Sequence, residues 1–125
     1  MGIISPVGND IPSFWNNLVN GVCGIGPIQS FDTTDLSVKV AAEVRDFNPA
    51  AFGIDPATAR KADLFVLYAL AAARQAMKES APDVAPERLG VYVGSGIGGI
   101  HTFINECRKL EEHGPNRVSP LFIPN

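Results

Sequence analysis

Residues able to do catalytic chemistry are scarce in this chain. Its cysteines are Cys23 and Cys107, and its histidines are His101 and His113. A cysteine nucleophile needs a nearby imidazole as its base, but Cys23 lies in a glycine-rich loop and Cys107 on the apolar face of a predicted helix. The two histidines stand at opposite ends of that helix. We therefore predict that both cysteines are packing residues and that this chain holds no catalytic residue and no metal site.

A glycine-rich turn, Gly94-Ser-Gly-Ile-Gly-Gly99, matches the G-x-G-x-x-G pattern of dinucleotide-binding proteins. The acidic residue expected about 20 positions later is absent, since Glu111 and Glu112 still lie on the predicted helix. We therefore expect no cofactor and interpret the glycines as allowing tight strand-to-helix packing. An intermediate interpretation is that Ile97 projects apolar surface into a neighbouring pocket. The Ser95 hydroxyl is expected to hydrogen-bond within the turn.

Two adjacent cations, Arg60 and Lys61, stand near the start of a predicted long helix, where the positive end of the helix dipole disfavours them. This placement is reasonable if they face an acidic partner or a phosphate, and Arg117 could extend the same patch. It is equally reasonable if they lie on a solvated face where Asp63 offsets their charge. The residues alone leave both interpretations open.

The composition is that of one small domain and excludes several classes of protein. The 125 residues carry a formal net charge of -3, which argues against a nucleic-acid binder that neutralises many phosphates. The chain begins without a signal-peptide pattern, so we expect a cytoplasmic protein with reduced thiols. No apolar run approaches the roughly 20 residues needed to cross a bilayer, so no membrane partner is expected.

Periodicity predicts a small set of helices and strands. Asp55 and Pro56 suit the start of a long helix, in which Ala69 and Ala71 to Ala73 would let another backbone approach closely. Gly114 and Pro115 mark the end of the last helix. Residues 21–27 are too rich in glycine for regular structure. The predicted elements are helices over 12–20, with an apolar face of Phe14, Trp15, Leu18 and Val19, over 57–80 and over 100–113; strands over 38–44 and 89–94; and an extended course over 117–124.

One buried strand and one poorer strand cannot cover three helices that each have an apolar face. We therefore predict an α/β fold with an incomplete sheet and packed helices. The missing strands would come from further chain or from another subunit. Both ends of the sequence are interpreted as interruptions, so that the 125 residues are truncated at both ends.

Several segments together resemble one family. The combination of Ser-Gly-Ile-Gly-Gly with Val-Ser-Pro-x-Phe-Ile-Pro is more specific than either motif alone. Throughout its length the chain resembles a β-ketoacyl-acyl-carrier-protein synthase of the second type. The segments that carry the resemblance are Ser5-Pro-Val-Gly-Asn9, Phe14-Trp15, Gly24-Ile-Gly-Pro-Ile28, Phe31-Asp32, Arg60-Lys-Ala-Asp63, Gly94-Ser-Gly-Ile-Gly-Gly99 and Val118-Ser-Pro-Leu-Phe-Ile-Pro124.

The resemblance implies the N-terminal portion of a thiolase-like fold, in a homodimer that extends fatty acids on acyl carrier protein. It implies that an active-site cysteine and two histidines lie beyond Asn125, so the isolated chain is expected to be inactive. It further implies that Ile97, Phe122 and Ile123 line the acyl-chain pocket. Arg60, Lys61 and Arg117 would then dock the acidic carrier protein.

Three departures from the family pattern bear on these expectations. The opening strand is missing before Met1, Ala62 replaces a usual methionine, and Asn116 stands where a base is common, which weakens the docking patch. Two alternatives accompany the main hypothesis: a polyketide-type ketosynthase, and a non-catalytic module that only docks carrier protein.

Overall fold

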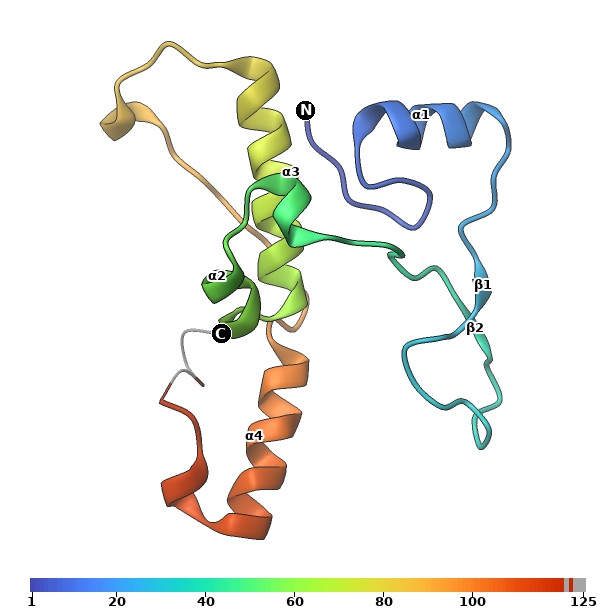
Figure 1. Ribbon diagram of the computed structural model, residues 1–125, viewed down its shortest axis with the longest axis vertical. Coiled ribbons are helices and arrows are strands. Elements are labelled where there is room, and N and C mark those ends of the chain that lie inside the picture. Colours follow the sequence, from blue (N-terminus) through green and yellow to red (C-terminus); the bar gives the residue numbers. More distant parts are fainter. Residues whose placement is uncertain (121, 123–125) are drawn as a thin grey trace. The chain divides into compact units, whose positions relative to one another are not determined.

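The computed structural model describes residues 1–120 and residue 122, which fall into two compact units (Figure 1). The first unit comprises residues 1–48 and 71–81, and the second comprises residues 49–70 together with the described residues from Pro82 onward. Helix α3, Leu64–Ser80, contributes residues to both units. The five described site residues, Arg60, Lys61, Ile97, Arg117 and Phe122, belong to the second unit, and the sixth predicted residue, Ile123, lies outside the described residues.

Helix α1, Ile11–Val19, confirms the first predicted helix. The Asp10 carboxylate caps it by accepting the Ser13 N–H at 2.8 Å. The Asn17 side-chain amide donates to the Val7 carbonyl at 2.7 Å and so ties the helix to the preceding turn. Its apolar face is mostly uncovered within the described residues, in line with the expectation that this chain lacks the strands to cover it, and only Phe14 is half-buried. The exposed members are Trp15, Leu18 and Val19.

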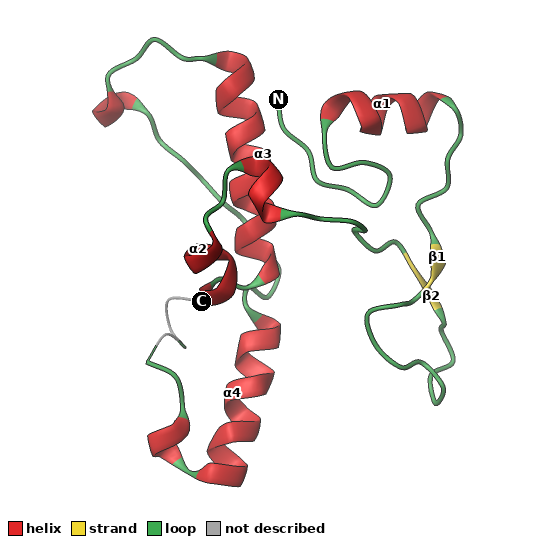
Figure 2. Ribbon diagram, in the orientation of Figure 1, coloured by secondary structure: helices red, strands yellow, loops and turns green. Residues whose placement is uncertain are grey.

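Strands β1, Gly26–Pro27, and β2, Val40–Ala41, form an antiparallel pair in which Gly26 lies opposite Ala41 (Figure 2). The predicted strand over 38–44 is therefore much shorter than expected. Its partner comes from the glycine-rich segment 21–27, so the prediction of irregular structure there is wrong at Gly26–Pro27 and confirmed over residues 21–25. Within the described residues this is the one sheet.

The predicted long helix is interrupted. Helix α2, Pro56–Lys61, ends at Ala62, whose ψ of 143° is extended, and α3 begins at Leu64. The start of α2 confirms the predicted cap, because an Asp55 oxygen accepts the N–H of Ala57 at 3.0 Å and of Thr58 at 2.9 Å. Continuity across residues 62–63 is wrong because Asp63 begins a new helix: its carbonyl accepts the Val66 N–H at 3.1 Å.

Small residues on α3 allow a close backbone approach, as predicted. A Cβ added to Gly2 would lie 1.9 Å from the Ala72 carbonyl oxygen, so only glycine fits against the helix there. Ala71 is fully buried in this unit. The second unit begins with the 3-10 turn η1, Pro49–Phe52. Its buried apolar residues among those described are Ile54, which follows this turn, and Leu67 on α3.

The predicted strand over 89–94 is wrong for the described residues. After the 3-10 turn η2, Pro86–Arg88, the chain runs to Gly94 without ladder hydrogen bonds, and the Tyr92 side chain is 99% exposed. A strand requires a neighbour for its N–H and C=O groups, and the described part of the chain supplies none here. The segment has the apolar composition of a buried strand, but among the described residues no neighbouring strand pairs with it and its side chains stay exposed.

Helix α4, Ile100–His113, confirms the last predicted helix, including its end. Gly114 has a φ of 78°, which favours glycine, and the following Pro115 prevents continuation. The predicted extended course is only partly correct, since η3, Pro115–Arg117, is a 3-10 turn and the Phe122 N–H donates to the Ser119 carbonyl at 3.1 Å. No helix among the described residues is long and apolar enough to cross a bilayer.

Candidate functional site

The glycine turn before α4 holds Ile97 outward. The Ser95 hydroxyl oxygen accepts the Gly98 N–H at 2.9 Å, which confirms the predicted bond within the turn. Gly98 has a φ of 75°, where a side chain would be strained. Ile97, between these two residues, is 77% exposed. The turn therefore presents an apolar side chain on a backbone fixed by its own hydrogen bond.

The expected tight packing around the glycines is not seen in the described structure. A Cβ added to Gly94 or Gly96 would meet no described heavy atom within 4 Å. At Gly98 it would lie 3.9 Å from Cζ of Phe65, an ordinary contact. Of Gly94, Gly96 and Gly98, only Gly98 needs to be glycine in the described structure. The reason is its positive φ and not a lack of space for a side chain.

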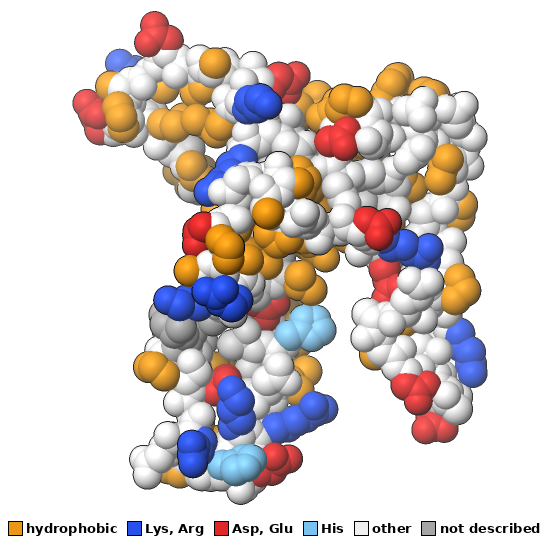
Figure 3. All heavy atoms as spheres, in the orientation of Figure 1, with side chains coloured by type: hydrophobic (Ala, Val, Ile, Leu, Met, Phe, Trp, Pro, Cys, Tyr) orange, Lys and Arg blue, Asp and Glu red, His pale blue; other side chains and the backbone are white. Residues whose placement is uncertain are grey.

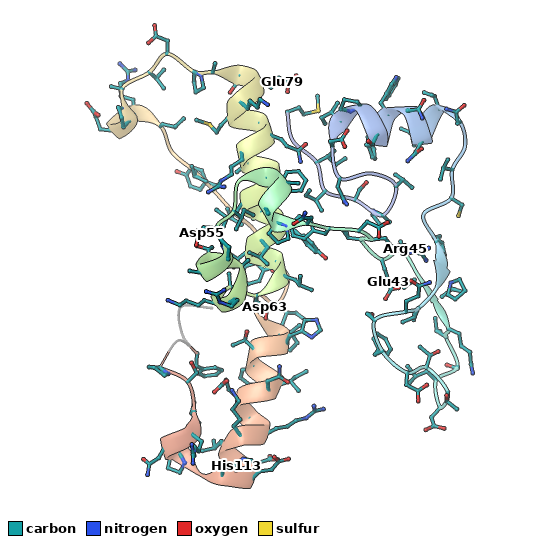
Figure 4. The ribbon with its side chains drawn as sticks, in the orientation of Figure 1. Glu43, Arg45, Asp55, Asp63, Glu79 and His113 are labelled. Atoms are coloured by element: carbon teal, nitrogen blue, oxygen red, sulfur yellow. The ribbon has the colours of Figure 1, made fainter. Side chains whose placement is uncertain are left out.

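A buried carboxylate joins the α2–α3 corner to the start of α4. Asp63, 9% exposed, accepts the N–H and the hydroxyl of Thr102 on Oδ2, each at 3.0 Å, and the Leu64 N–H on Oδ1 at 2.6 Å. Burial by itself raises the pKa of the Asp63 carboxyl, but the donors from Thr102 and Leu64, with the charge of His101, outweigh it and leave the pKa below its ordinary value. Figure 4 shows Asp63 at this corner.

The basic residues Arg60 and Lys61 occupy the last turn of α2. The prediction that they meet the positive end of a helix dipole is therefore wrong, because the helix ends at Lys61 and the cations stand at its negative end. Both side chains are exposed. Asp63 does not pair with them, and neither makes an ion pair with any carboxylate in the described part of the chain.

Arg117 stands at the end of η3 and is also exposed, without an ion pair to any described carboxylate. Figure 3 shows Lys and Arg side chains over α2 and along α4 and η3 on the face in view. Exposed cations without acidic neighbours attract an acidic surface. The exposure of Arg60, Lys61 and Arg117, without described ion pairs, agrees with the interpretation that they bind a partner.

A second buried carboxylate, Glu106, organises the segment after α4. It accepts the Ser119 N–H at 2.6 Å and the Lys109 ammonium at 2.6 Å. Beyond Ser119, the half-buried Phe122 ring packs on Phe103 with a centroid distance of 5.9 Å. Ile123, the other predicted residue of this segment, lies outside the described residues.

Sequence reasoning missed both buried carboxylates. Glu106 lies three or four positions from Phe103 and Leu110, and thus on the same face of α4 as these apolar residues. A carboxylate inside an apolar stripe is the signal that could have revealed it, since such a group is rarely buried without partners. For Asp63, the signal is its suitability as a helix N-cap.

Cys107, His101 and His113 all lie on α4, whereas Cys23 lies in the loop before β1. Cys23 is exposed and Cys107 half-buried, and both are free thiols. His101 stands at the start of α4 and His113 at its end, where Figure 4 shows it. The described residues contain no group of three or more His, Cys, Asp or Glu side chains placed to hold a metal ion.

Comparison with known proteins identifies the family. The whole chain, residues 1–125, matches the family described as "Beta-ketoacyl synthase, N-terminal domain". The chain belongs to this β-ketoacyl synthase family. Its predicted membership is thereby confirmed.

The similarity to individual ketoacyl synthases extends over nearly the whole chain. It is 44% identical over 127 aligned residues to "3-oxoacyl-[acyl-carrier-protein] synthase 2" of Staphylococcus aureus, covering 99% of this chain and 31% of that protein. It is 41% identical to the protein of the same name from Coxiella burnetii, of which it covers 30%. The chain therefore spans about a third of the length of these relatives.

A solved structure agrees with the family. "The ishigamide ketosynthase/chain length factor" superposes with a TM-score of 0.75 at 27% identity, over 98% of this chain and 31% of that one. The predicted fold class, a partial thiolase-like α/β fold, is confirmed, with two short strands as its sheet among the described residues.

Proposed function

We propose that this β-ketoacyl synthase chain works as the N-terminal portion of an enzyme that condenses malonyl-acyl-carrier-protein with an acyl chain in fatty acid elongation. The observation that carries the proposal is the 44% identity, over 99% of the chain, to a protein named for this synthase. In the reaction, the malonyl unit loses carbon dioxide and its carbanion attacks the acyl thioester. A new carbon–carbon bond forms and the thiol leaves.

The chemical steps are assigned to residues outside these 125. The family resemblance implies a nucleophilic cysteine and two histidines beyond Asn125, and the free thiols Cys23 and Cys107 are assigned no part in the chemistry. A thiolate nucleophile requires a depressed pKa or an adjacent base. The part played by this chain is therefore binding.

Ile97, Phe122 and Ile123 are proposed to border the acyl-chain pocket, and Ile123 lies outside the described residues. The exposure of Ile97 on a fixed turn supports this role, because an apolar side chain held outward stabilises a ligand that covers it. Phe122 offers an aromatic face already supported by Phe103. Both are suited to contact methylene groups rather than to react with them.

Arg60, Lys61 and Arg117 are proposed to receive the acidic carrier protein. All three are exposed, and no described carboxylate pairs with them. Exposed cations of this kind accelerate encounter with an acidic partner and lose their effect as salt rises. Asn116, where the family commonly has a base, leaves the patch one charge weaker.

Homodimer assembly and a cytoplasmic location belong to the same proposal. Large apolar side chains such as Val91, Tyr92 and Val93 are exposed in the second unit, and contiguous apolar surface of this kind commonly marks a protein interface. The two free thiols, Cys23 and Cys107, suit a reducing compartment.

Two alternatives predict different results. The first alternative is a polyketide-type ketosynthase, against which stands the 44% identity to a protein named 3-oxoacyl-[acyl-carrier-protein] synthase 2. A module that only docks carrier protein is favoured by the unpaired cations. It requires the isolated chain to unfold cooperatively and to bind carrier protein without any catalytic partner.

The proposal can be tested with a chimera, in which the 125 residues replace the matching region of the S. aureus 3-oxoacyl-acyl-carrier-protein synthase 2. The remainder of that enzyme supplies the proposed nucleophile and histidines. We expect the chimera to condense acyl- and malonyl-carrier-protein. The isolated chain and the S. aureus enzyme lacking the region should show no turnover.

Two results would contradict the proposal. A purified, folded chimera that binds carrier protein but never forms product would favour the docking module. Detectable turnover by the isolated 125 residues would refute the assignment of the chemistry to residues outside this chain.

A further inference from the structure

Glu106 is the more deeply buried of the two buried carboxylates among the described residues, at 6% exposed. It lies on the apolar face of α4, where a charged group is costly unless it is paired. The binding roles proposed above make no use of it. Its contacts therefore call for their own explanation.

Both oxygens of Glu106 are engaged. Oε2 accepts the Ser119 N–H at 2.6 Å, and Oε1 accepts Nζ of Lys109 at 2.6 Å. The Lys109 ammonium and the Ser119 N–H together hold the pKa of Glu106 below its ordinary value, against the effect of burial. The side chain is thus a charged acceptor at neutral pH, and such hydrogen bonds are stronger than neutral ones.

The bond to Ser119 fixes a segment that reverses direction after α4. The reversal occurs at Gly114, with a φ of 78°, and η3 follows. Arg117 lies two residues before Ser119. Phe122 lies three residues after it, and its own N–H donates to the Ser119 carbonyl at 3.1 Å. The bond to Glu106 therefore holds the backbone to α4 at Ser119, which lies between Arg117 and Phe122 in the sequence.

We propose that Glu106 is a positioning residue that, by holding the Ser119 N–H against α4, sets Arg117 for carrier-protein docking and Phe122 for contact with the acyl chain. The inference rests on the proposed function of those two residues. It adds that one buried carboxylate couples carrier affinity to acyl-chain selectivity. Neither property should change independently when the bond to Ser119 is lost.

The test uses the chimera with three variants. Glu106→Ala removes the acceptor, and Glu106→Gln keeps an oxygen that can accept the Ser119 N–H. Glu111→Ala is the matched control, since Glu111 is an exposed carboxylate on the same helix. The readouts are KM for acyl-carrier-protein, kcat with the shortest acyl chain accepted, and the ratio of kcat/KM between long and short chains. Amide exchange over residues 115–122 reports on the bond itself.

For Glu106→Ala we expect KM to rise about fivefold, the long-to-short ratio to change by a similar factor, and kcat for the short chain to stay within about twofold. Exchange should accelerate over residues 115–122 and not elsewhere. Glu106→Gln should recover most of each change, because the acceptor oxygen remains. Glu111→Ala should match the parent.

The outcomes separate this inference from the function on which it rests. A parent chimera without turnover would refute the proposed function, and the positioning role with it. An active parent in which Glu106→Ala matches Glu111→Ala would overturn the positioning role alone. So would a Glu106→Gln variant as impaired as Glu106→Ala, or a uniform loss of kcat on all chains with faster exchange throughout the protein.

Discussion

Substitution of Ile97 by phenylalanine tests the proposed acyl-chain pocket most sharply. Ile97 is 77% exposed, and the turn that carries it is held by the Ser95–Gly98 bond rather than by the isoleucine side chain. Ile97→Phe should therefore fold like the parent, because no described core is disturbed. Its effect should appear only when an acyl chain needs the space that the larger ring takes.

The size of the effect follows from methylene burial. Each buried CH2 group is worth about 0.8 kcal/mol, so excluding one two-carbon unit costs about 1.6 kcal/mol. This corresponds to a loss of about 15-fold in kcat/KM for the chains that no longer fit, since 1.36 kcal/mol is tenfold. Shorter chains, which never reach the ring, should keep their parental values.

The assay is a competition in the chimera among acyl-carrier-proteins of increasing chain length, with products separated by mass. Ile97→Phe should lower the longest chain accepted by about one two-carbon unit, and Ile97→Ala should not. Ser95→Ala, which removes the turn's side-chain acceptor, should blur the limit rather than move it. An unchanged chain-length profile in a folded Ile97→Phe chimera would refute the pocket role of this residue.

Two further predictions concern the docking cations and the buried aspartate. Replacing both Arg60 and Lys61 with glutamine should raise KM for carrier protein about three- to tenfold and flatten its salt dependence. The control Arg88→Gln, at another exposed arginine, should change neither quantity. Equal effects of the double variant and the control on KM would contradict specific docking. The pKa of Asp63 is lowered in the folded chain, so its contribution to the free energy of unfolding is present above the unfolded pKa of about 3.9 and is lost as pH falls through the lower, folded value. Asp63→Asn should therefore destabilise the chimera by about 1–3 kcal/mol at pH 7 in urea unfolding, and the difference from the parent chimera should shrink in acid. A pH-independent difference would contradict the assignment.

Local signals in the sequence predicted the helix ends well. Asp55 with Pro56 gave the start of α2, and Gly114 with Pro115 gave the end of α4, because capping depends on residues within a few positions. The break at Asp63 was missed because neither glycine nor proline marks it. The Asp63 carboxylate is held by the N–H and the hydroxyl of Thr102, 39 positions away. No local pattern reveals such a partner.

Strand predictions failed for a related reason. Val91, Tyr92 and Val93 have the composition of a buried strand, but a strand exists only where a neighbour pairs with it. Conversely, Gly26 and Pro27 form a short strand because Val40 and Ala41 happen to lie opposite them. Pairing is a property of the whole arrangement and not of either segment.

Two local features of the candidate site could be predicted from neighbouring residues alone. The bond of Ser95 within its turn followed from the glycine pattern, and the exposure of Arg60 and Lys61 followed from their charge. For the two buried carboxylates, local signals mark Glu106 and Asp63 themselves but not the distant partners that hold them. The hydrogen-bond partner of Glu106 is the Ser119 N–H, and Ser119 lies near α4 because the chain reverses direction at Gly114.

The most direct test of the central claim is the product formed by the chimera from a defined acyl-carrier-protein and labelled malonyl-carrier-protein. If this chain is the N-terminal portion of a fatty acid condensing enzyme, mass spectrometry should show a 3-oxoacyl product with a labelled two-carbon extension, accompanied by stoichiometric carbon dioxide. A folded chimera that binds both carrier proteins and returns them unchanged would contradict it.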